Sequence, residues 1–224
     1  MTDERVLHVS GPERVGYEAA YERQRELVGR CLDSGGQDNY LMLVEHPPVI
    51  TIGRSSEGED LLAGAQILEE RGVELVQTNR GGKATFHGPG QLVIYPIIDL
   101  RARGRDLHRY LRDLETWLIR LLDSYGIDAG TNPPHTGVWV EERKVASIGI
   151  AVRRWISYHG IALNLNNDMS FFDLIVPCGL PDVQMESMSG LLGRELDFEQ
   201  VARRAVRMFR EDFDFPGSGT AERV

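Results

Sequence analysis

The chain has 224 residues, of which 42% are hydrophobic and 26% are charged, and its formal net charge is −9. A chain of this kind can bury a core, and its acidic balance argues against a general nucleic-acid binder, which needs a basic face. No apolar run approaches the ~18 residues that a membrane span needs, and the first residues lack the apolar core of a signal peptide. We therefore expect a cytoplasmic protein that binds neither nucleic acid nor membrane.

The first half of the chain combines helical periodicity with short apolar runs. A helix is predicted at 17–32 because apolar residues recur there at intervals of three and four. Cys31 falls on the apolar face of this helix and is interpreted as a core residue, since a free thiol packs as a small hydrophobe. The next elements predicted are strands at 40–46 and 49–53, a short helix at 60–71 and a strand at 73–78.

The second half begins with a glycine-rich loop at 80–90. After it we predict a strand at 92–100, a helix at 106–125, strands at 137–142, 144–154 and 155–166, and a closing helix at 197–212. Strands and helices mix without regular βαβ alternation, which favours an α/β (α+β) fold with a mixed sheet flanked by helices. We expect residues 1–215 to form a single domain and residues 216–224 to be a disordered tail.

Residues 101–112 carry five arginines and one aspartate. Such a run is either a solvated helix end or a docking patch for an acidic partner. The sequence leaves both interpretations open.

The loop at 80–90 has four glycines, which let backbone N–H groups approach a ligand closely. Arg80 and His87 add polar donors to it. The loop lacks the Gly-Lys-Ser/Thr ending of a phosphate-binding P-loop, and its spacing is wrong for a dinucleotide fingerprint. It is therefore an ordinary turn or a binding loop of another kind.

Cys178 lies between Pro177 and Gly179, after the apolar run DLIV. Proline fixes the approach of the chain, and glycine removes bulk beside the sulfur, which suits a nucleophile that meets a bulky thioester. The alternative is an ordinary loop cysteine. A thiol acts as a nucleophile only when it is a thiolate, so a base or a cation must lie nearby.

Histidines and lysines are the candidates to activate this thiol. The histidines considered are His46, His87, His135 and His159, and none has the spacing of a metal site. The chain has only two lysines, Lys83 and Lys144, against 23 arginines. Lys144 opens an apolar strand, where a lysine is usually solvated. The functional alternative is a partly desolvated amine beside the thiol, which stabilises a thiolate and also carries a proton, as arginine does not.

Five segments between residues 45 and 190 resemble the lipoyl(octanoyl) transferase family. They are RGGKATFHGPGQL, the Gly-Val-Trp-Val run, KVASIGIAVRRW, SYHGIALNLN and FFDLIVPCGL, in the order and spacing of that family. Two positions depart from the usual pattern: Lys83 stands where glutamine is also common, and Phe86 where tyrosine is usual.

The resemblance implies a fold similar to lipoate and biotin protein ligases, with a mixed sheet around an acyl-binding tunnel. It implies that Cys178 forms an acyl thioester, that Lys144 is its proton-transfer partner, and that no cofactor is needed. The residues implied to bind the substrate are Arg80, Gly81, Gly82, Lys83, Ala84, Thr85, Phe86, His87, Ser147, Ile148, Gly149, Gly160, Ile161 and Ala162.

The donor implied is octanoyl-acyl carrier protein. The acceptors are lysines on lipoyl domains of 2-oxoacid dehydrogenase E2 subunits and on the glycine-cleavage H protein. We expect backbone N–H groups at Gly179 or near Gly82 to stabilise the oxyanion. Two alternatives remain: an ATP-dependent lipoate-protein ligase on the same fold, which would not need Cys178, and a non-catalytic acyl-binding protein.

Overall fold

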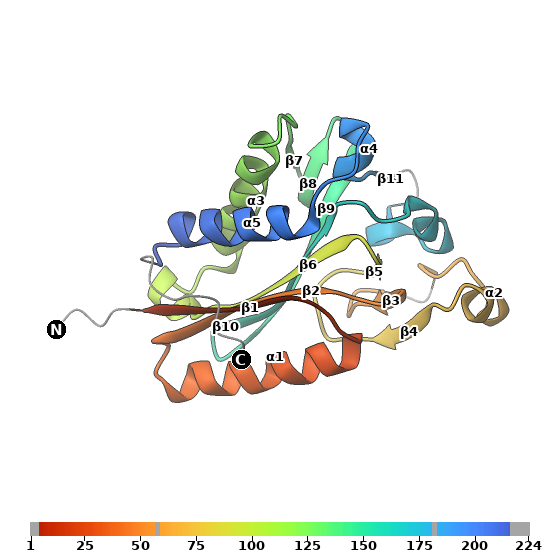
Figure 1. Ribbon diagram of the computed structural model, residues 1–224. Helices are drawn as coiled ribbons and strands as arrows, with labels where there is room; N and C mark the ends of the chain where they lie inside the picture. The colour runs from red at the N-terminus through yellow and green to blue at the C-terminus, as the bar shows by residue number, and fades with distance from the viewer. Residues whose placement is uncertain (1–4, 57–58, 181–182, 216–224) are drawn as a thin grey trace.

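A large mixed sheet organises the fold of the computed structural model, which describes residues 5–56, 59–180 and 183–215 (Figure 1). The strand order is β1-β2-β6-β10-β9-β8-β7, and β11 pairs with β9. The β1–β2 and β11–β9 pairs are parallel, and the other pairs are antiparallel. The strands are β1 (Val6–Arg14), β2 (Asp38–Glu45), β6 (Gln91–Ile97), β7 (Gly130–Asn132), β8 (His135–Val140), β9 (Arg143–Arg153), β10 (Ile156–Asn164) and β11 (Gln184–Met185).

Helices cover both faces of this sheet. On one face lies α1 (Tyr17–Asp33), whose apolar side packs with β2, β6 and β10 in one buried cluster. On the other lie α3 (Leu107–Asp123) and α5 (Phe198–Asp212), which contact each other and form the larger core with the sheet (Figure 1). The side chains of Asp106 and Asp197 cap these two helices by accepting backbone N–H groups at their first turns.

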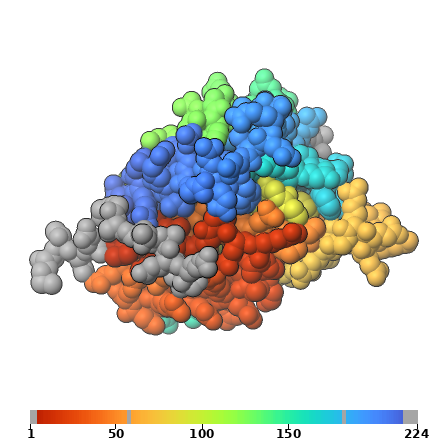
Figure 2. Space-filling model, viewed as in Figure 1, coloured from red at the N-terminus to blue at the C-terminus, as the bar shows by residue number. Residues whose placement is uncertain are grey.

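A second, smaller sheet lies beside the large one. Its order is β4 (Glu74–Gln77), β3 (Val49–Ile52) and β5 (Ala84–His87). It packs with α2 (Ala65–Glu70) and the 3₁₀ helix η2 (Met169–Leu174) around a third apolar cluster. In Figure 2 the segment of α2 and β4 projects at the right edge of the molecule.

Most elements predicted from periodicity are confirmed; two predicted segments need correction, and some elements were not predicted. The helix expected at 60–71 begins only at Ala65, because Leu61 instead forms a β-bridge with Ile175. The loop expected at 80–90 contains β5, whose side chains are all buried. The strand β1, at 6–14, was not predicted: exposed and buried residues alternate irregularly along it.

The short elements β7, β11 and α4 (Met188–Leu192) were also not predicted. The tail expected at 216–224 lies outside the described residues. Within the described ranges, no helix has both the length and the apolar character to cross a membrane.

The arginine-rich segment 101–112 is largely paired within the chain. Arg101 pairs with Asp99 at 2.8 Å, Arg103 with Asp113 at 3.4 Å, and Arg112 with Glu115. These pairs neutralise much of the local charge and favour the interpretation as a helix end over that as a docking patch.

Candidate active site

Cys178 lies in a strained turn, Pro177–Gly179, which we call the nucleophile turn. Its φ of 58° and ψ of 14° are left-handed, a conformation uncommon for residues other than glycine and frequent at functional sites. The chain before the turn is fixed, because the Val176 N–H donates to the Asp60 carbonyl at 2.8 Å. The turn holds the thiol partly exposed.

Lys144 contacts this thiol directly. Its Nζ donates to the Cys178 Sγ at 3.1 Å, and its side chain is buried, with 2% exposure. The nitrogen also lies 5.3 Å from the centre of the Trp139 ring, a favourable position for a cation. The structure therefore favours the interpretation of Lys144 as a desolvated amine beside the thiol over that as a solvated lysine.

Gly137 provides the space that Lys144 occupies. A Cβ at this position would lie 2.5 Å from the lysine Cε, and the glycine φ of 131° is one that other residues rarely adopt. The Gly137 N–H donates to the buried carboxylate of Glu115 on α3 at 2.9 Å. Helix α3 thus fixes the backbone against which the lysine side chain lies.

A pocket of about 490 Å³, including its open mouth, extends from Cys178 into the protein. Thirteen of the fourteen residues implied to bind substrate line it. Six of them lie on the neighbouring antiparallel strands β10 and β9, where Gly160 pairs with Gly149, Ile161 with Ile148, and Ala162 with Ser147. The fourteenth, Phe86, lies elsewhere: its ring stacks on Phe171 in the third apolar cluster.

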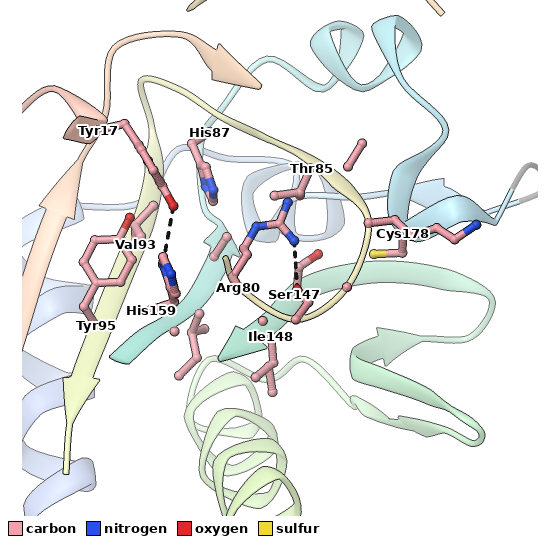
Figure 3. Close-up of a pocket in the computed structure, with 18 residues that line it drawn as sticks. Tyr17, Arg80, Thr85, His87, Val93, Tyr95, Ser147, Ile148, His159 and Cys178 are labelled. Carbon is pink, nitrogen blue, oxygen red and sulfur yellow. Dashed lines mark hydrogen bonds between the residues drawn. The ribbon is translucent and has the colours of Figure 1, made fainter. Parts of the chain in front are cut away.

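The far end of the pocket is closed by side chains that sequence reasoning did not assign to it. Figure 3 places Tyr17, Tyr95 and His159 at the end opposite Cys178, with Arg80 between. Tyr17 was predicted only as part of an apolar helix face, and Tyr95 as part of an apolar strand. Nothing in the periodicity distinguishes a residue that faces a cavity from one that faces a filled core.

The three histidines of this region are held neutral. Burial lowers the pKa of His46 to about 4 and that of His159 to about 3, where Arg80 adds to the effect. Burial, followed by the neighbouring His46 and the positive charge of Arg80, lowers the pKa of His87 well below its usual value. Each ring also has a fixed partner: Val15 for His46, Asn79 for His159 and Gln91 for His87. None of these rings has a hydrogen bond to the Cys178 thiol, whereas the Lys144 amine does.

Arg80 is a fixed positive charge inside the pocket wall. Its guanidinium donates to the Thr51 carbonyl at 2.6 Å, to the Thr51 hydroxyl at 2.9 and 3.1 Å, and to the Gly81 carbonyl at 3.0 Å. These bonds hold the glycine-rich loop in shape, and the Gly81 N–H attaches the loop to β9 through the Ile150 carbonyl at 3.1 Å. The loop is therefore a structured wall of the pocket.

The two expected oxyanion donors differ in availability. The Gly179 N–H donates to the Val176 carbonyl at 3.0 Å, so the fold itself uses this hydrogen. This overturns Gly179 as a donor in this conformation. Among the described residues, the Gly82 N–H has no backbone acceptor.

Solved structures with a similar architecture include ligases of lipoate and biotin. A lipoate-protein ligase A bound with ATP has a TM-score of 0.71 at 16% identity, covering 94% of this chain and 86% of the other. A biotin protein ligase from Aquifex aeolicus, in complex with biotin and ATP, has a TM-score of 0.54 at 13% identity, covering 93% and 70%. At these identities the likeness establishes the fold, which is that of lipoate and biotin ligases.

Sequence comparison is more specific. The model of the lipoyl protein ligase A/B catalytic domain matches residues 17–210. An octanoyltransferase of Solibacter usitatus is 47% identical over 93% of this chain and 94% of its own length. One of Rubrobacter xylanophilus is 48% identical over 90% and 91%. The chain belongs to the lipoyl protein ligase A/B family.

Proposed function

We propose that this chain is an octanoyltransferase. It takes an octanoyl group from a carrier-protein thioester, holds it as a thioester on Cys178, and passes it to a lysine of a lipoyl domain. The observation that carries the proposal is the 3.1 Å contact of the Lys144 amine with the Cys178 thiol at one end of the pocket. The relatives named octanoyltransferase, aligned over nine tenths of the chain, support the same reaction.

In the first half-reaction, the Cys178 thiolate attacks the donor carbonyl and forms a tetrahedral intermediate. When this collapses, the carbon–sulfur bond to the carrier breaks and the carrier thiol takes a proton from the Lys144 ammonium. One thioester replaces another, so the free energy changes little. The octanoyl chain then lies along Ile148 and Ile161.

In the second half-reaction, the neutral amine of the acceptor lysine attacks the thioester on Cys178. Lys144, now neutral, takes the proton that this nitrogen releases, and collapse gives an amide and restores the thiolate–ammonium pair. The products are octanoylated acceptor and free carrier. Formation of an amide from a thioester is downhill, so no nucleotide is needed.

The donor proposed is octanoyl-acyl carrier protein, and the acceptors are lipoyl domains of 2-oxoacid dehydrogenase E2 subunits and the glycine-cleavage H protein. A structural analysis of an archaeal lipoylation system from Thermoplasma acidophilum concerns a bipartite lipoate protein ligase, whose fold is similar to this one, and its E2 lipoyl domain. That relative supports a lipoyl-domain acceptor for this architecture. The relatives named octanoyltransferase support an eight-carbon acyl group.

Transfer to a lipoyl domain with and without ATP tests the proposal. We expect octanoyl-acyl carrier protein alone to octanoylate the acceptor lysine, and ATP with free octanoate to give no product. The reverse result would establish the ATP-dependent ligase. Binding of octanoate without product under either condition would indicate an acyl-binding protein.

A further inference from the structure

Both lysines of the chain lie near the nucleophile turn, and the side chain of each packs against a glycine. Lys144 lies against Gly137, and Lys83 lies against Gly179, where a Cβ would stand 2.1 Å from the lysine Cδ and 2.7 Å from its Nζ. Lys83 lines the same pocket as Cys178. The other 23 basic side chains, apart from histidine, are arginines. Both lysines of the chain therefore lie at this site, Lys83 against Gly179 and Lys144 against the Cys178 thiol.

A buried aspartate holds the charge of Lys83 at this place. The Asp60 Oδ1 lies 3.8 Å from the Lys83 Nζ, and the exposures of the two side chains are 6% and 36%. In the described part of the chain, the other oxygen of Asp60 has no hydrogen-bond partner. The Asp60 backbone carbonyl accepts the Val176 N–H, so one residue connects Lys83 to the nucleophile turn. The long ionic contact leaves the ammonium hydrogens available to a ligand.

The reaction needs donors to a developing negative charge: the Gly82 N–H is one candidate, and Lys83 is placed to supply a second. Each half-reaction puts a negative charge on the former carbonyl oxygen. The N–H groups of Gly179 and Leu180 are already bonded to the Val176 and Pro177 carbonyls. Lys144 is directed at the sulfur. A fixed cation in a partly dry site stabilises such a charge far more than water does.

We propose that Lys83 is a further catalytic residue, whose ammonium donates a hydrogen bond to the oxyanion of both tetrahedral intermediates. This inference rests on the proposed octanoyl transfer. Lys83 gives up no proton. It remains an ammonium while the carbon–sulfur bond to Cys178 forms and the bond to the carrier thiol breaks, and again while the carbon–nitrogen bond to the acceptor forms and the bond to Cys178 breaks. Asp60 is a positioning residue that acts through Lys83.

Stopped-flow acylation of Cys178 tests the proposal, with octanoyl-acyl carrier protein as one donor and octanoyl-N-acetylcysteamine, a thioester without protein, as the other. The variants are Lys83→Met, which removes the donor, Lys83→Gln, which keeps a neutral one, and Lys83→Arg, which keeps a charged one. We expect the acylation rate constant at saturating donor to fall by about 10- to 100-fold in Lys83→Met. Lys83→Gln should fall less, and Lys83→Arg least, with both donors.

Three outcomes would overturn the proposal. The first is an unchanged rate constant in Lys83→Met. The second is an effect confined to the carrier-protein donor or to the apparent KM, which would make Lys83 a contact for the carrier. The third is an equal loss in all three variants, which would make it structural. Failure of the wild type to acylate Cys178 at all would instead reject octanoyl transfer.

Asp60→Asn supplies an independent check. If Asp60 acts through Lys83, the loss in the double variant Asp60→Asn/Lys83→Met equals that of Lys83→Met alone. Losses that multiply would contradict the positioning role. Thermal unfolding of each variant separates a misfolded protein from a slow one.

Discussion

The two cysteines show how the same thiol differs between two regions of one fold. Cys31 lies in α1 with no exposed surface, among apolar side chains, and burial raises its pKa to about 12. Cys178 lies at a left-handed turn that opens on a pocket, with an amine 3.1 Å from its sulfur. The first thiol fills space in a core, and the second has an amine beside it and opens on a pocket. Reactivity follows from backbone conformation and neighbours.

The largest expected effect on the transfer rate comes from replacing the Cys178 thiol by a hydroxyl. Cys178→Ser should lose octanoyl transfer by at least about a thousandfold, because a serine hydroxyl beside an ammonium is a poor nucleophile. Cys31→Ser is the matched control and should keep the rate while losing stability, because it buries a hydroxyl among apolar groups. Transfer rates and thermal unfolding measure both effects. Equal rates in wild type and Cys178→Ser would contradict the assignment.

The next effect concerns the amine that distinguishes the two thiols. Lys144→Met should slow both half-reactions by about 10²- to 10⁴-fold. The variant can neither stabilise the Cys178 thiolate nor transfer a proton to or from the substrates. Lys144→Arg keeps the charge but accepts no proton, so it should impair transfer to the acceptor more than acylation. Single-turnover measurement of each half-reaction compares them. An arginine variant that keeps the wild-type rate in both half-reactions would argue against a proton-carrying role.

A smaller effect is expected from the glycine that accommodates Lys144. Gly137→Ala places a methyl group 2.5 Å from the lysine Cε and should reduce acylation by roughly tenfold through displacement of the amine. The control is Gly104→Ala, which also has a positive φ but meets no atom within 4 Å. Backbone strain in Gly104→Ala is about 1 kcal/mol, and at the Gly137 φ of 131° it is larger, on the order of 1–3 kcal/mol. If both lost the same activity, strain alone would explain the result.

The smallest expected effect is on the pH dependence of stability, and it comes from the buried histidines. The folded pKa values of about 4 for His46 and about 3 for His159 lie below the unfolded value of ~6.5. Below pH 6.5 the unfolded chain therefore binds more protons, so the free energy of unfolding falls as the pH drops. The fall approaches 1.4 kcal/mol per pH unit for each histidine, as an order of magnitude.

His46→Gln tests this effect. Glutamine can replace both bonds of His46, one to the Val15 carbonyl and one to the Tyr95 hydroxyl. We expect chemical unfolding between pH 7 and pH 5 to show a smaller loss of stability in this variant than in wild type. The same dependence of stability on pH in variant and wild type would mean that the pKa of His46 does not differ between the folded and unfolded chain.

Periodicity predicted most of the fold because amphipathic patterns report burial directly. The helices at 17–32, 106–125 and 197–212 each have one apolar stripe, and each packs it on a sheet or a neighbouring helix. Short elements such as β11 depend on partners far along the chain. The pairing of Met185 with Lys144 has no local pattern that would reveal it.

The candidate site was predictable as a set of motifs and only partly as an arrangement. The glycines at 81 and 82 and the Pro-Cys-Gly sequence at 177–179 left a binding loop and a nucleophile as open alternatives, and the family resemblance implied both. The distance between Lys144 and Cys178, which lie 34 positions apart, follows only from the pairing of β9 with β8 and β11. Likewise, Phe86 sits among pocket residues in sequence, but strand alternation turns its ring to the opposite face.

The most direct test of the central claim is the intact mass of the protein after incubation with octanoyl-acyl carrier protein in the absence of ATP, followed by peptide mapping. We predict one octanoyl group, roughly 126 Da as the difference between acyl and hydrogen, on Cys178 and not on Cys31. The adduct should be released by hydroxylamine and discharged by a lipoyl domain. No adduct on Cys178, or a label carried by Cys31, would contradict the assignment of Cys178 as the acyl-carrying nucleophile.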